Sequence, residues 1–448
     1  MHIKIWTEDE LTTLDLGDAR LHRRAEKLLG AMYTSPCSSL PEACCGWADT
    51  NAAYRFFMND SVSAEALLKA HSDSTIGRIK RSGSAVILCI QDTTELNFNG
   101  QQIEDLGRLS YDAQRGMYLH PTLCVTPERI ALGVTDAWMW ARGKTKEADE
   151  KNPSVTESIR WIEGYERVCE MAASVPDSRL VYVADRECDL RELMQRAEHL
   201  GHPADWLVRA KHNRNLGNKE KLWDKITKRK PLASIRFTKS RKKGEKARQV
   251  CQEIKVLPCC LHASSHTPTT VTLVEAREIN PPFGKAPLVW RLLTNRSVDS
   301  AEEAIELLDW YLCRWEIEMF FDVLKVGCEV EKLQLNHRGR IEKALALYMI
   351  VTWRVMNLMR LGRECPELSA SLIFDTLEWK AAYGLNNQPL PDKPPTLNEV
   401  IRQLAMLGGF LARKSDGEPG TKSIWKGLQR LQDCIYGVHL SEKIKGLI

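Results

Sequence analysis

The chain has 448 residues, of which 43% are hydrophobic and 27% are charged, so it can bury a large core divided among two or three domains. Its most apolar stretch, residues 344–353, is about half as long as a membrane-spanning helix, and residues 1–10 lack the basic and apolar parts of a signal peptide. The 14 cysteines form no regular framework, so these features exclude a membrane protein and a disulfide-stapled secreted domain, and they predict a cytoplasmic protein.

The net charge of +4 conceals a strong concentration of basic residues. Residues 209–248 hold 16 Lys or Arg and three acidic residues, a segment charge of +13, so the rest of the chain carries −9. Trp223 and Phe237 lie among the basic residues, an arrangement that suits a polyanion-binding surface. The alternative is a solvated basic loop. We favour nucleic-acid binding, because neutralising phosphates gives such clustering a purpose.

Residues 1–75 are predicted to be helical. In residues 16–32, leucine and alanine side chains recur on one helical face, and the arginines and lysine between them lie on other faces. A further helix is expected to begin at Ser63. Small helical domains with an arginine-rich face often bind DNA, although a merely soluble helix has the same pattern.

Strands and helices then alternate. Short apolar runs predict buried strands, and polar turn residues between two apolar runs predict a hairpin. The predicted strands are 85–90, 118–126, 129–140, 179–184 and 206–211, and the predicted helices are 154–175 and 186–200. A long basic insert then reads as β structure. From about residue 337 the chain is predicted to be helical, apart from a proline-rich loop at 386–395.

Residues 309–327 read as one apolar helix that carries charged residues. At about 100° per residue from Tyr311, Arg314 falls near −60°, Glu318 near −20° and Lys325 near −40°. All four therefore share a stripe about 60° wide, and the other faces are apolar. Such a narrow polar stripe indicates a site. The alternative is a structural ion-pair ladder between Arg314 and Glu318.

Two aspartates, Asp92 and Asp185, directly follow predicted buried strands. Ligand sites in open α/β sheets lie at such carboxyl ends. Taken singly, each aspartate is better explained as a helix cap or turn residue. Together with Glu318 they supply the three carboxylates that two Mg²⁺ ions need, and Arg314 and Lys325 would hold the phosphate that the metals activate.

The spacing Tyr311-x2-Arg314-x3-Glu318-x6-Lys325 resembles the Y-R-E-K signature of bacterial insertion-sequence DDE transposases of the IS-four family, in the branch typified by the transposase of transposon Tn-five. Other segments support the resemblance in the same order: QDTTEL at 91–96, RGMYLH at 115–120, DRECD at 185–189, LVRAKH at 207–212, EINPP at 278–282 and LGGF at 407–410. The resemblance covers nearly the whole chain, except about 213–270, which does not align with the family.

The resemblance implies an α/β fold with a ribonuclease-H-like catalytic core and a β insert, flanked by N-terminal and C-terminal helical domains. Three domains are expected. They are a helical domain that binds transposon ends (1–75), a catalytic domain (76–335) with a basic β insert at about 212–295, and a C-terminal helical dimerisation domain (336–448).

The resemblance also implies a chemistry. Members of this family cut transposon ends and join them to target DNA by two-metal phosphoryl transfer, through a hairpin intermediate. The catalytic residues and ligands of two Mg²⁺ or Mn²⁺ ions would be Asp92, Asp185 and Glu318. The residues that contact DNA would be Tyr311, Arg314, Lys325, Arg209, Lys211, Trp290 and Trp315, with the two tryptophans near the flipped base of the hairpin.

Alternatives remain open at this point. Trp290 and Trp315 could instead pack in the core. The protein could be a related metal-dependent nuclease that cuts without joining, or a catalytically silent DNA-binding relative. Its expected partners are double-stranded DNA and, when DNA is bound, a second copy of the chain, with no membrane. The candidate dimer-interface residues are Leu397, Ile401, Leu404, Leu407, Trp425, Leu428 and Leu431, which could equally pack within the chain.

Overall fold

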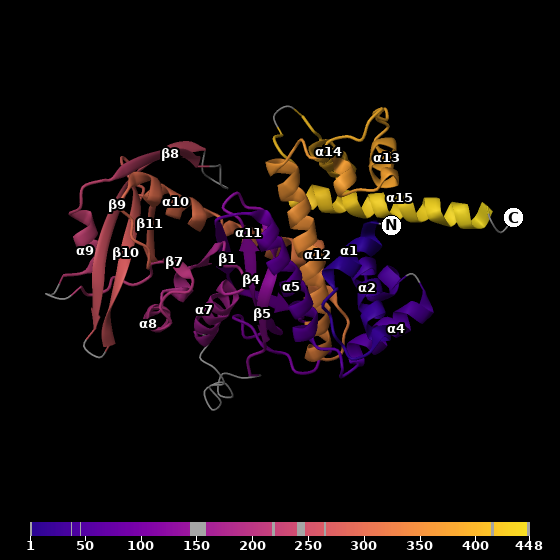
Figure 1. Cartoon of the computed structure of the whole chain (residues 1–448), viewed down its shortest axis with the longest axis horizontal. Helices are drawn as coiled ribbons and strands as arrows, with labels where there is room; N and C mark the ends of the chain where they lie inside the picture. The colour runs from indigo at the N-terminus through magenta and orange to yellow at the C-terminus, as the bar shows by residue number, and fades with distance from the viewer. Residues whose placement is uncertain are drawn as a thin grey trace. The chain divides into compact units, whose positions relative to one another are not determined.

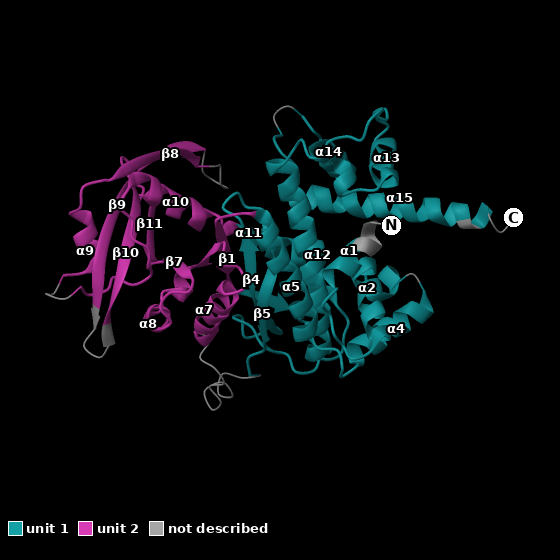
Figure 2. Cartoon of the chain, viewed as in Figure 1, with its two compact units in different colours: residues 1–82, 93–153, 316–448 teal, residues 83–92, 154–315 magenta. Residues whose placement is uncertain are grey.

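The computed structural model describes residues 2–36, 38–44, 46–143, 158–216, 220–239, 247–263, 266–413 and 416–445. The chain forms two compact units, which Figure 2 distinguishes by colour: unit 1 contains residues 1–82, 93–153 and 316–448, and unit 2 contains residues 83–92 and 154–315. This division follows compactness rather than sequence order. The predicted domain limits at residues 75 and 335 therefore stay a prediction.

Unit 1 begins with helices, as predicted. They are α1 (His2–Glu10), α2 (Ala19–Thr34), α3 (Leu40–Cys44), α4 (Trp47–Met58) and α5 (Ala64–Ser82). The carboxylate of Asp18 accepts the N–H of Arg20 at the start of α2. The hydroxyl oxygen of Ser63 accepts the N–H of Ala66 in the same way, so the prediction that a helix begins at Ser63 is confirmed.

Acidic neighbours neutralise much of the basic face of α2. Arg20 pairs with Asp18 at 2.8 Å. Arg24 and Lys27 both pair with Asp49 of α4, at 2.9 and 2.8 Å. The arginine-rich face predicted from the sequence is therefore partly balanced within the helical region itself.

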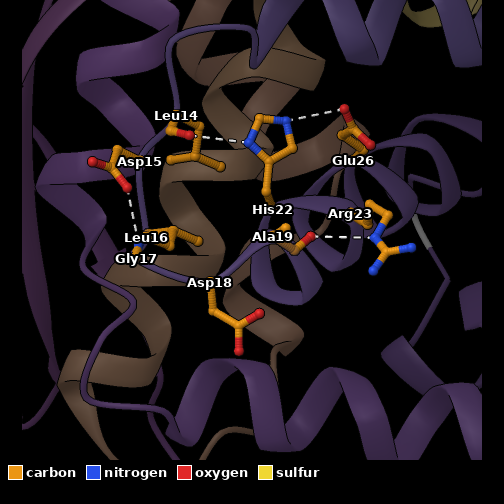
Figure 3. A pocket seen from close by; sticks show the side chains of 9 residues that line it. All are labelled: Leu14, Asp15, Leu16, Gly17, Asp18, Ala19, His22, Arg23 and Glu26. Carbon is orange, nitrogen blue, oxygen red and sulfur yellow. Dashed lines mark hydrogen bonds and ion pairs between the residues drawn. The ribbon is translucent and has the colours of Figure 1, made fainter.

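A pocket of about 410 Å³ lies beside the first turns of α2 (Figure 3). The side chain of His22 lies at its wall, with Nδ1 3.0 Å from the carbonyl oxygen of Leu14 and Nε2 3.1 Å from the carboxylate of Glu26. The imidazole thus ties the loop before α2 to the helix. The pocket contains none of the residues that the sequence predicts for catalysis.

The helix α12 (Arg338–Glu364) runs through the core of unit 1. It packs against α2, α5 and the strand β5 (Ala131–Trp140) (Figure 1). Within the described ranges it is the one helix long and apolar enough to cross a membrane, and 89% of its apolar window is buried inside the structure. α12 is therefore the central helix of a folded core. It extends beyond the apolar run at 344–353 in both directions.

Further helices follow α12. They are the 3₁₀ turn η4 (Ala370–Leu372), α13 (Thr376–Leu385), α14 (Leu397–Leu407) and α15 (Thr421–Lys445). The proline-rich loop separates α13 from α14, as predicted. The seven candidate dimer-interface residues are at most 7% exposed, so their assignment to an interface is wrong. The reason is that α13, α14 and α15 pack on one another and direct these apolar faces inward.

The strands of unit 1 are antiparallel. Strand β4 (Arg115–Val125) pairs with β2 (Thr94–Asn97), β3 (Gly107–Arg108) and β5. The predicted hairpin is thus confirmed. Its β5 strand is irregular near its start, because Gly133 pairs with Cys124 while Ala131 pairs with Val125, which leaves Leu132 between them as an extra residue.

A buried ionic cluster joins α1 and α5 to this irregularity. The carboxylate of Glu10 accepts Nη1 of Arg78 at 2.8 Å and Nδ1 of His71. Nε2 of His71 accepts the N–H of Val134 at 3.0 Å, and Nε of Arg78 donates to the carbonyl oxygen of Leu132 at 2.5 Å. Burial alone would raise the pKa of Glu10, but the two partners outweigh it and lower the pKa to about 2.

Glu10 should make the stability of the protein sensitive to acid. The ordinary pKa of a glutamate, 4.5, applies in the unfolded chain, so the contribution of Glu10 is fully present above pH 4.5 and is lost as the pH falls toward 2. We expect Glu10→Gln to lower the free energy of unfolding at neutral pH and to flatten its decline below pH 4.5. Urea unfolding at a series of pH values measures this. Glu8→Gln, at an exposed position of the same helix, is the control, and matching pH profiles of Glu10→Gln and wild type would contradict the expectation.

Unit 2 contains a mixed sheet. The strand order is β1-β6-β7-β11-β10-β9-β8, with β1, β6 and β7 parallel and the rest antiparallel. The strands are β1 (Val86–Gln91), β6 (Arg179–Ala184), β7 (Asp205–Arg209), β8 (Ala233–Lys239), β9 (Arg248–Ala263), β10 (His266–Glu278) and β11 (Val289–Thr294). The helices are α7 (Ile159–Ala172), η1 (Arg186–Cys188), α8 (Arg191–His199), α9 (Leu222–Thr227) and α10 (Ala301–Leu312). The predicted α/β class with a β insert and helical flanks is confirmed.

The single helix predicted over 309–327 is wrong. Helix α10 ends at Leu312, α11 spans Trp315–Asp322, and the π-helix η2 spans Val323–Gly327. The break arises because the N–H of Arg314 bonds to the carbonyl of Tyr311, a tight three-residue turn. A constant step of 100° therefore does not hold across this segment, and the calculated stripe does not describe its geometry.

Candidate active site

Three charged residues lie at the carboxyl edge of the parallel strands of unit 2. Gln91, the last residue of β1, pairs with Ala184, the last residue of β6, which in turn pairs with Val208 of β7. The residues that come next are Asp92, Asp185 and Arg209. Because parallel neighbours end at the same edge, the register places two carboxylates and a guanidinium on adjacent strands.

The C-terminal end of α10 holds Asp92 through an arginine. Nη1 of Arg314 lies 2.7 Å from Oδ2 of Asp92, and the two side chains are 11% and 25% exposed. A charge-assisted hydrogen bond of this length in a partly buried place fixes both groups. Arg314 and Asp92 are 222 residues apart in the sequence, so only the fold brings them together.

Asp185 is held by the last turn of the same helix. The hydroxyl of the buried Tyr311 donates to Oδ1 of Asp185 at 3.0 Å. Burial and the charge of Asp185 raise the pKa of Tyr311 well above its ordinary value, against the opposing charges of Arg314 and Arg209. The phenol therefore stays a neutral hydrogen-bond donor at any physiological pH. The structure thus brings Asp92, Asp185, Tyr311 and Arg314 to one edge of unit 2.

Lys325 lies in unit 1 on the π-helix η2. Its Nζ donates to the carbonyl oxygen of Glu95 at 2.8 Å and lies 3.4 Å from the carboxylate of Glu331. Glu331 also accepts the N–H of Asn97 at 2.8 Å. The N–H of Cys328 reaches back to the carbonyl of Val323, which closes the wide turn of a π-helix, and such turns are frequent at functional sites.

Glu318 lies on α11, also in unit 1, and is half-buried. The orientation of α11 is set by its neighbour Glu316, whose buried carboxylate accepts Nε of Arg360 on α12 at 2.9 Å. Residues two apart on a helix point in nearly opposite directions. Since Glu316 faces α12, Glu318 projects away from that central helix.

The three predicted carboxylates have the right chemistry for a hard divalent cation, because they offer only oxygen ligands. Across the described ranges, no group of three or more His, Cys, Asp or Glu side chains is close enough together to hold a metal ion. In this structure Arg314 and Tyr311 engage oxygens of the two aspartates. The donor set therefore fits such a cation chemically, and the three-residue metal site itself stays a prediction.

The two tryptophans predicted to contact DNA differ in their surroundings. Trp315 is 58% exposed, so the alternative that it packs in the core is wrong. Trp290 is half-buried and stacks on Phe237, with ring centroids 6.4 Å apart and an interplanar angle of 21°. Trp290 is therefore part of the partly covered face of the insert sheet, whereas Trp315 offers a free aromatic surface.

The structure describes only part of the basic segment 209–248. Residues 217–219 and 240–246 lie outside the described residues, and the second range holds most of the run SRKKGEKAR. Several of its described charges are paired. These pairs are Arg214 with Asp189, Lys228 with Glu220, and Arg248 with Glu278. Trp223 lies under the guanidinium of Arg291, 4.2 Å from it. Lys211 is exposed and Arg209 is half-buried.

Sequence reasoning missed two acidic residues that bind residues predicted for the site. Glu331 holds Lys325, and Asp189 binds the chain at Lys211. For Asp189 a signal was present, because it ends the DRECD segment that begins at Asp185. No pattern in the sequence relates Glu331 to Lys325 in the same way.

Three family models match the chain in order. The Transposase DNA-binding model matches residues 3–62, the Transposase DDE domain model matches 162–354, and the Transposase Tn5 dimerisation domain model matches 350–444. Together the three matches cover most of the chain, so it belongs to the DDE transposase family. Within that class it resembles the Tn5 transposase, so the family resemblance read from the Y-R-E-K spacing is confirmed. A DDE domain implies a general dependence on divalent metal. The segment of this chain that matches the DDE model includes Asp185 and Glu318 but not Asp92.

A solved structure also matches, although weakly. It is the cryo-EM structure of a piggyBac transposase synaptic complex with hairpin DNA, with 10% sequence identity and a TM-score of 0.34. The match covers 78% of this chain and 57% of that chain, so this chain spans less than two thirds of the other's length. A likeness this weak carries no argument about fold or function.

Proposed function

We propose that the protein cuts DNA at transposon ends and joins the cut ends to target DNA by phosphoryl transfer that uses two divalent metal ions. The observation that carries the proposal is the carboxyl edge of unit 2, where Asp92 and Asp185 lie on adjacent strands beside Tyr311 and Arg314. Carboxylates held on rigid strand ends, with cationic and phenolic donors next to them, suit chemistry on a phosphodiester.

In this proposal Asp92, Asp185 and Glu318 hold Mg²⁺ or Mn²⁺. When bound, the ions would activate the attacking water or hydroxyl and stabilise the charge that develops on the phosphate. Arg314 now neutralises Asp92, and it would turn to the phosphate once a cation takes over that carboxylate. Tyr311 would donate to a phosphate oxygen in the same exchange, because its raised pKa keeps its proton in place.

DNA contacts extend from the same edge. Arg209 follows the register of the two aspartates, and Lys211 lies two residues further along, exposed to solvent. We propose that both bind phosphates of the transposon end, and that Lys325 binds a phosphate at the cut site. The exposed ring of Trp315 would support a base that leaves the duplex when the cut end forms a hairpin, and we assign the same role to Trp290.

The same edge also supports a nuclease that cuts without joining. The two activities differ in what the flanking DNA records, because transposition leaves inverted terminal repeats bounded by short direct duplications. The presence of the expected residue at all six Y-R-E-K and aspartate positions argues against a catalytically silent DNA-binding relative. In either active case we place the protein in the bacterial cytoplasm, associated with DNA.

We further propose that a second copy of the chain covers the distal half of α15. Tyr436, Leu440 and Ile444 follow one another at intervals of four residues and are 56%, 45% and 48% exposed, so they form one apolar stripe. The stripe lies within the segment that matches the Tn5 dimerisation model. Because two transposon ends must be joined in concert, two chains each holding one end form the active unit.

The catalytic carboxylates can be tested singly. Changing Asp92, Asp185 or Glu318 to Ala should lower Mg²⁺-dependent nicking of end DNA by more than about a hundredfold, beyond what the loss of an outer-shell partner costs. Binding of end DNA should stay nearly unchanged, because basic residues supply the affinity. Asp322→Ala, exposed and one turn beyond Glu318 on the same helix, is the control and should nick normally. Full nicking by Glu318→Ala would sink the assignment.

The basic contacts can be tested through their salt dependence. Replacing Arg209 and Lys211 together by Ala should weaken binding of end DNA and reduce the slope of log Kd against log salt by about one unit for each lost phosphate contact. The matched control is the replacement of Lys225 and Lys228, which lie in the same basic segment but interact with Glu220. A slope that stays at the wild-type value would show that Arg209 and Lys211 touch no phosphate.

The dimer can be tested without deleting core helices. Tyr436→Glu combined with Leu440→Glu should leave the protein folded and monomeric in complex with end DNA, whereas wild type pairs two ends in a dimer. Size-exclusion chromatography with light scattering, with and without end DNA, measures this. Leu390→Glu, which changes an equally exposed leucine in the proline-rich loop, is the control. If the double variant still pairs two ends, the dimer contact lies elsewhere.

A further inference from the structure

Asp189 fastens the chain that follows β7 to the loop that carries Asp185. Its buried carboxylate accepts the main-chain N–H of Lys211 at 2.6 Å and of His212 at 2.9 Å with the same oxygen, Oδ2. The guanidinium of Arg214 pairs with the other oxygen and also donates to the main-chain oxygen of Asp189 at 2.7 Å. Four bonds therefore join one short loop to the segment 211–214.

The loop itself is stiff. The 3₁₀ turn η1 begins after Asp185 and ends before Asp189, with the N–H of Cys188 bonded to the carbonyl of Asp185 at 3.0 Å. The thiol of Cys188 is fully buried and donates to the hydroxyl of Tyr182 on β6. One end of this turn thus carries a proposed metal ligand, and the other end grips the main chain of a proposed DNA contact.

Stability alone explains this arrangement poorly. Removing two charges from water costs free energy that their attraction repays only with good geometry, so a buried ion pair is weak evidence of added stability. What the four bonds do provide is a fixed distance and direction between two chain segments. A carboxylate that receives two consecutive main-chain N–H groups holds that main chain in one orientation.

We propose that Asp189 is a positioning residue, which sets the place of Lys211 relative to Asp185 so that the phosphate bound by Lys211 brings the scissile phosphate to the catalytic edge. The inference rests on the proposed function, in which Lys211 binds the transposon end. Asp189 itself touches no DNA. Its effect on DNA binding therefore passes through Lys211.

A double-mutant cycle on binding tests this in the full-length protein. The probe is a labelled duplex with the terminal repeat of the flanking DNA, and binding is measured in EDTA so that no cutting contributes. Lys211→Ala should weaken binding about tenfold in the wild-type background, the size expected for one charged contact. In the Asp189→Asn background the same change should cost less than about twofold, because Lys211 is already misplaced.

Asp205 offers a matched control, because it lies at the start of β7, at the opposite end of the strand from Lys211. It is also buried and binds Arg179, Asn295 and Arg296, which are remote from the carboxyl edge in the register of β7. Lys211→Ala should therefore cost the full tenfold in the Asp205→Asn background. Arg214→Lys, which keeps the charge pair with Asp189, should likewise preserve the full cost.

The outcomes separate the inference from the function on which it rests. If Lys211→Ala costs the same in the Asp189→Asn and wild-type backgrounds, Asp189 only stabilises the fold and the inference is overturned. If Lys211→Ala has no effect in wild type, the proposed DNA contact fails, and the inference falls with it. Should Asp189→Asn not fold, as judged by thermal unfolding, the cycle is run with Arg214→Met, which removes the ion pair from the other side and should also reduce the cost.

Discussion

The in-register parallel pairing of β1 with β6 is the constraint on which the candidate site depends. Gln91 and Ala184 are partners, so the next residue of each strand, Asp92 and Asp185, emerges at the same edge. A shift of one residue would turn one of the two carboxylates to the other face of the sheet. Both strands are apolar and buried, which specifies the register strongly because any slip would move the core residues as well.

Two adjacent carboxylates on neighbouring strands repel each other, and the protein offsets that repulsion with groups from the end of α10. Arg314 supplies a full positive charge to Asp92, and Tyr311 supplies a neutral donor to Asp185. The asymmetry has a consequence for cation binding. If the proposed metal site is right, a cation at Asp92 would have to displace a guanidinium, whereas one at Asp185 would displace only a hydrogen bond. We therefore expect the first ion to bind more favourably at Asp185.

The strand ends of the candidate site and several helix limits could be predicted from the sequence, because signals between neighbouring residues specify them. The apolar runs before Asp92 and Asp185 located both strand ends, and the proline-rich loop and Ser63 located helix limits. The continuous helix over 309–327 could not be corrected in advance, since its composition stays helical through Cys313 and only a hydrogen bond to Tyr311 breaks it. The long-range partners Glu331 and Arg360 were out of reach for a different reason, because ion pairs between distant segments leave no periodic pattern.

The C-terminal helices show the limit of apolar periodicity most clearly. The period of Leu397, Ile401 and Leu404 correctly indicates a buried face, but burial against α15 and burial against a second chain produce the same pattern. Apolar residues that stay exposed in the folded chain distinguish the two cases. Tyr436, Leu440 and Ile444 continue the helical period on the part of α15 where neighbouring helices no longer cover it. An exposed apolar stripe is typical of an interaction surface, and its position within the match to a dimerisation domain is the reason for proposing a second copy as its partner.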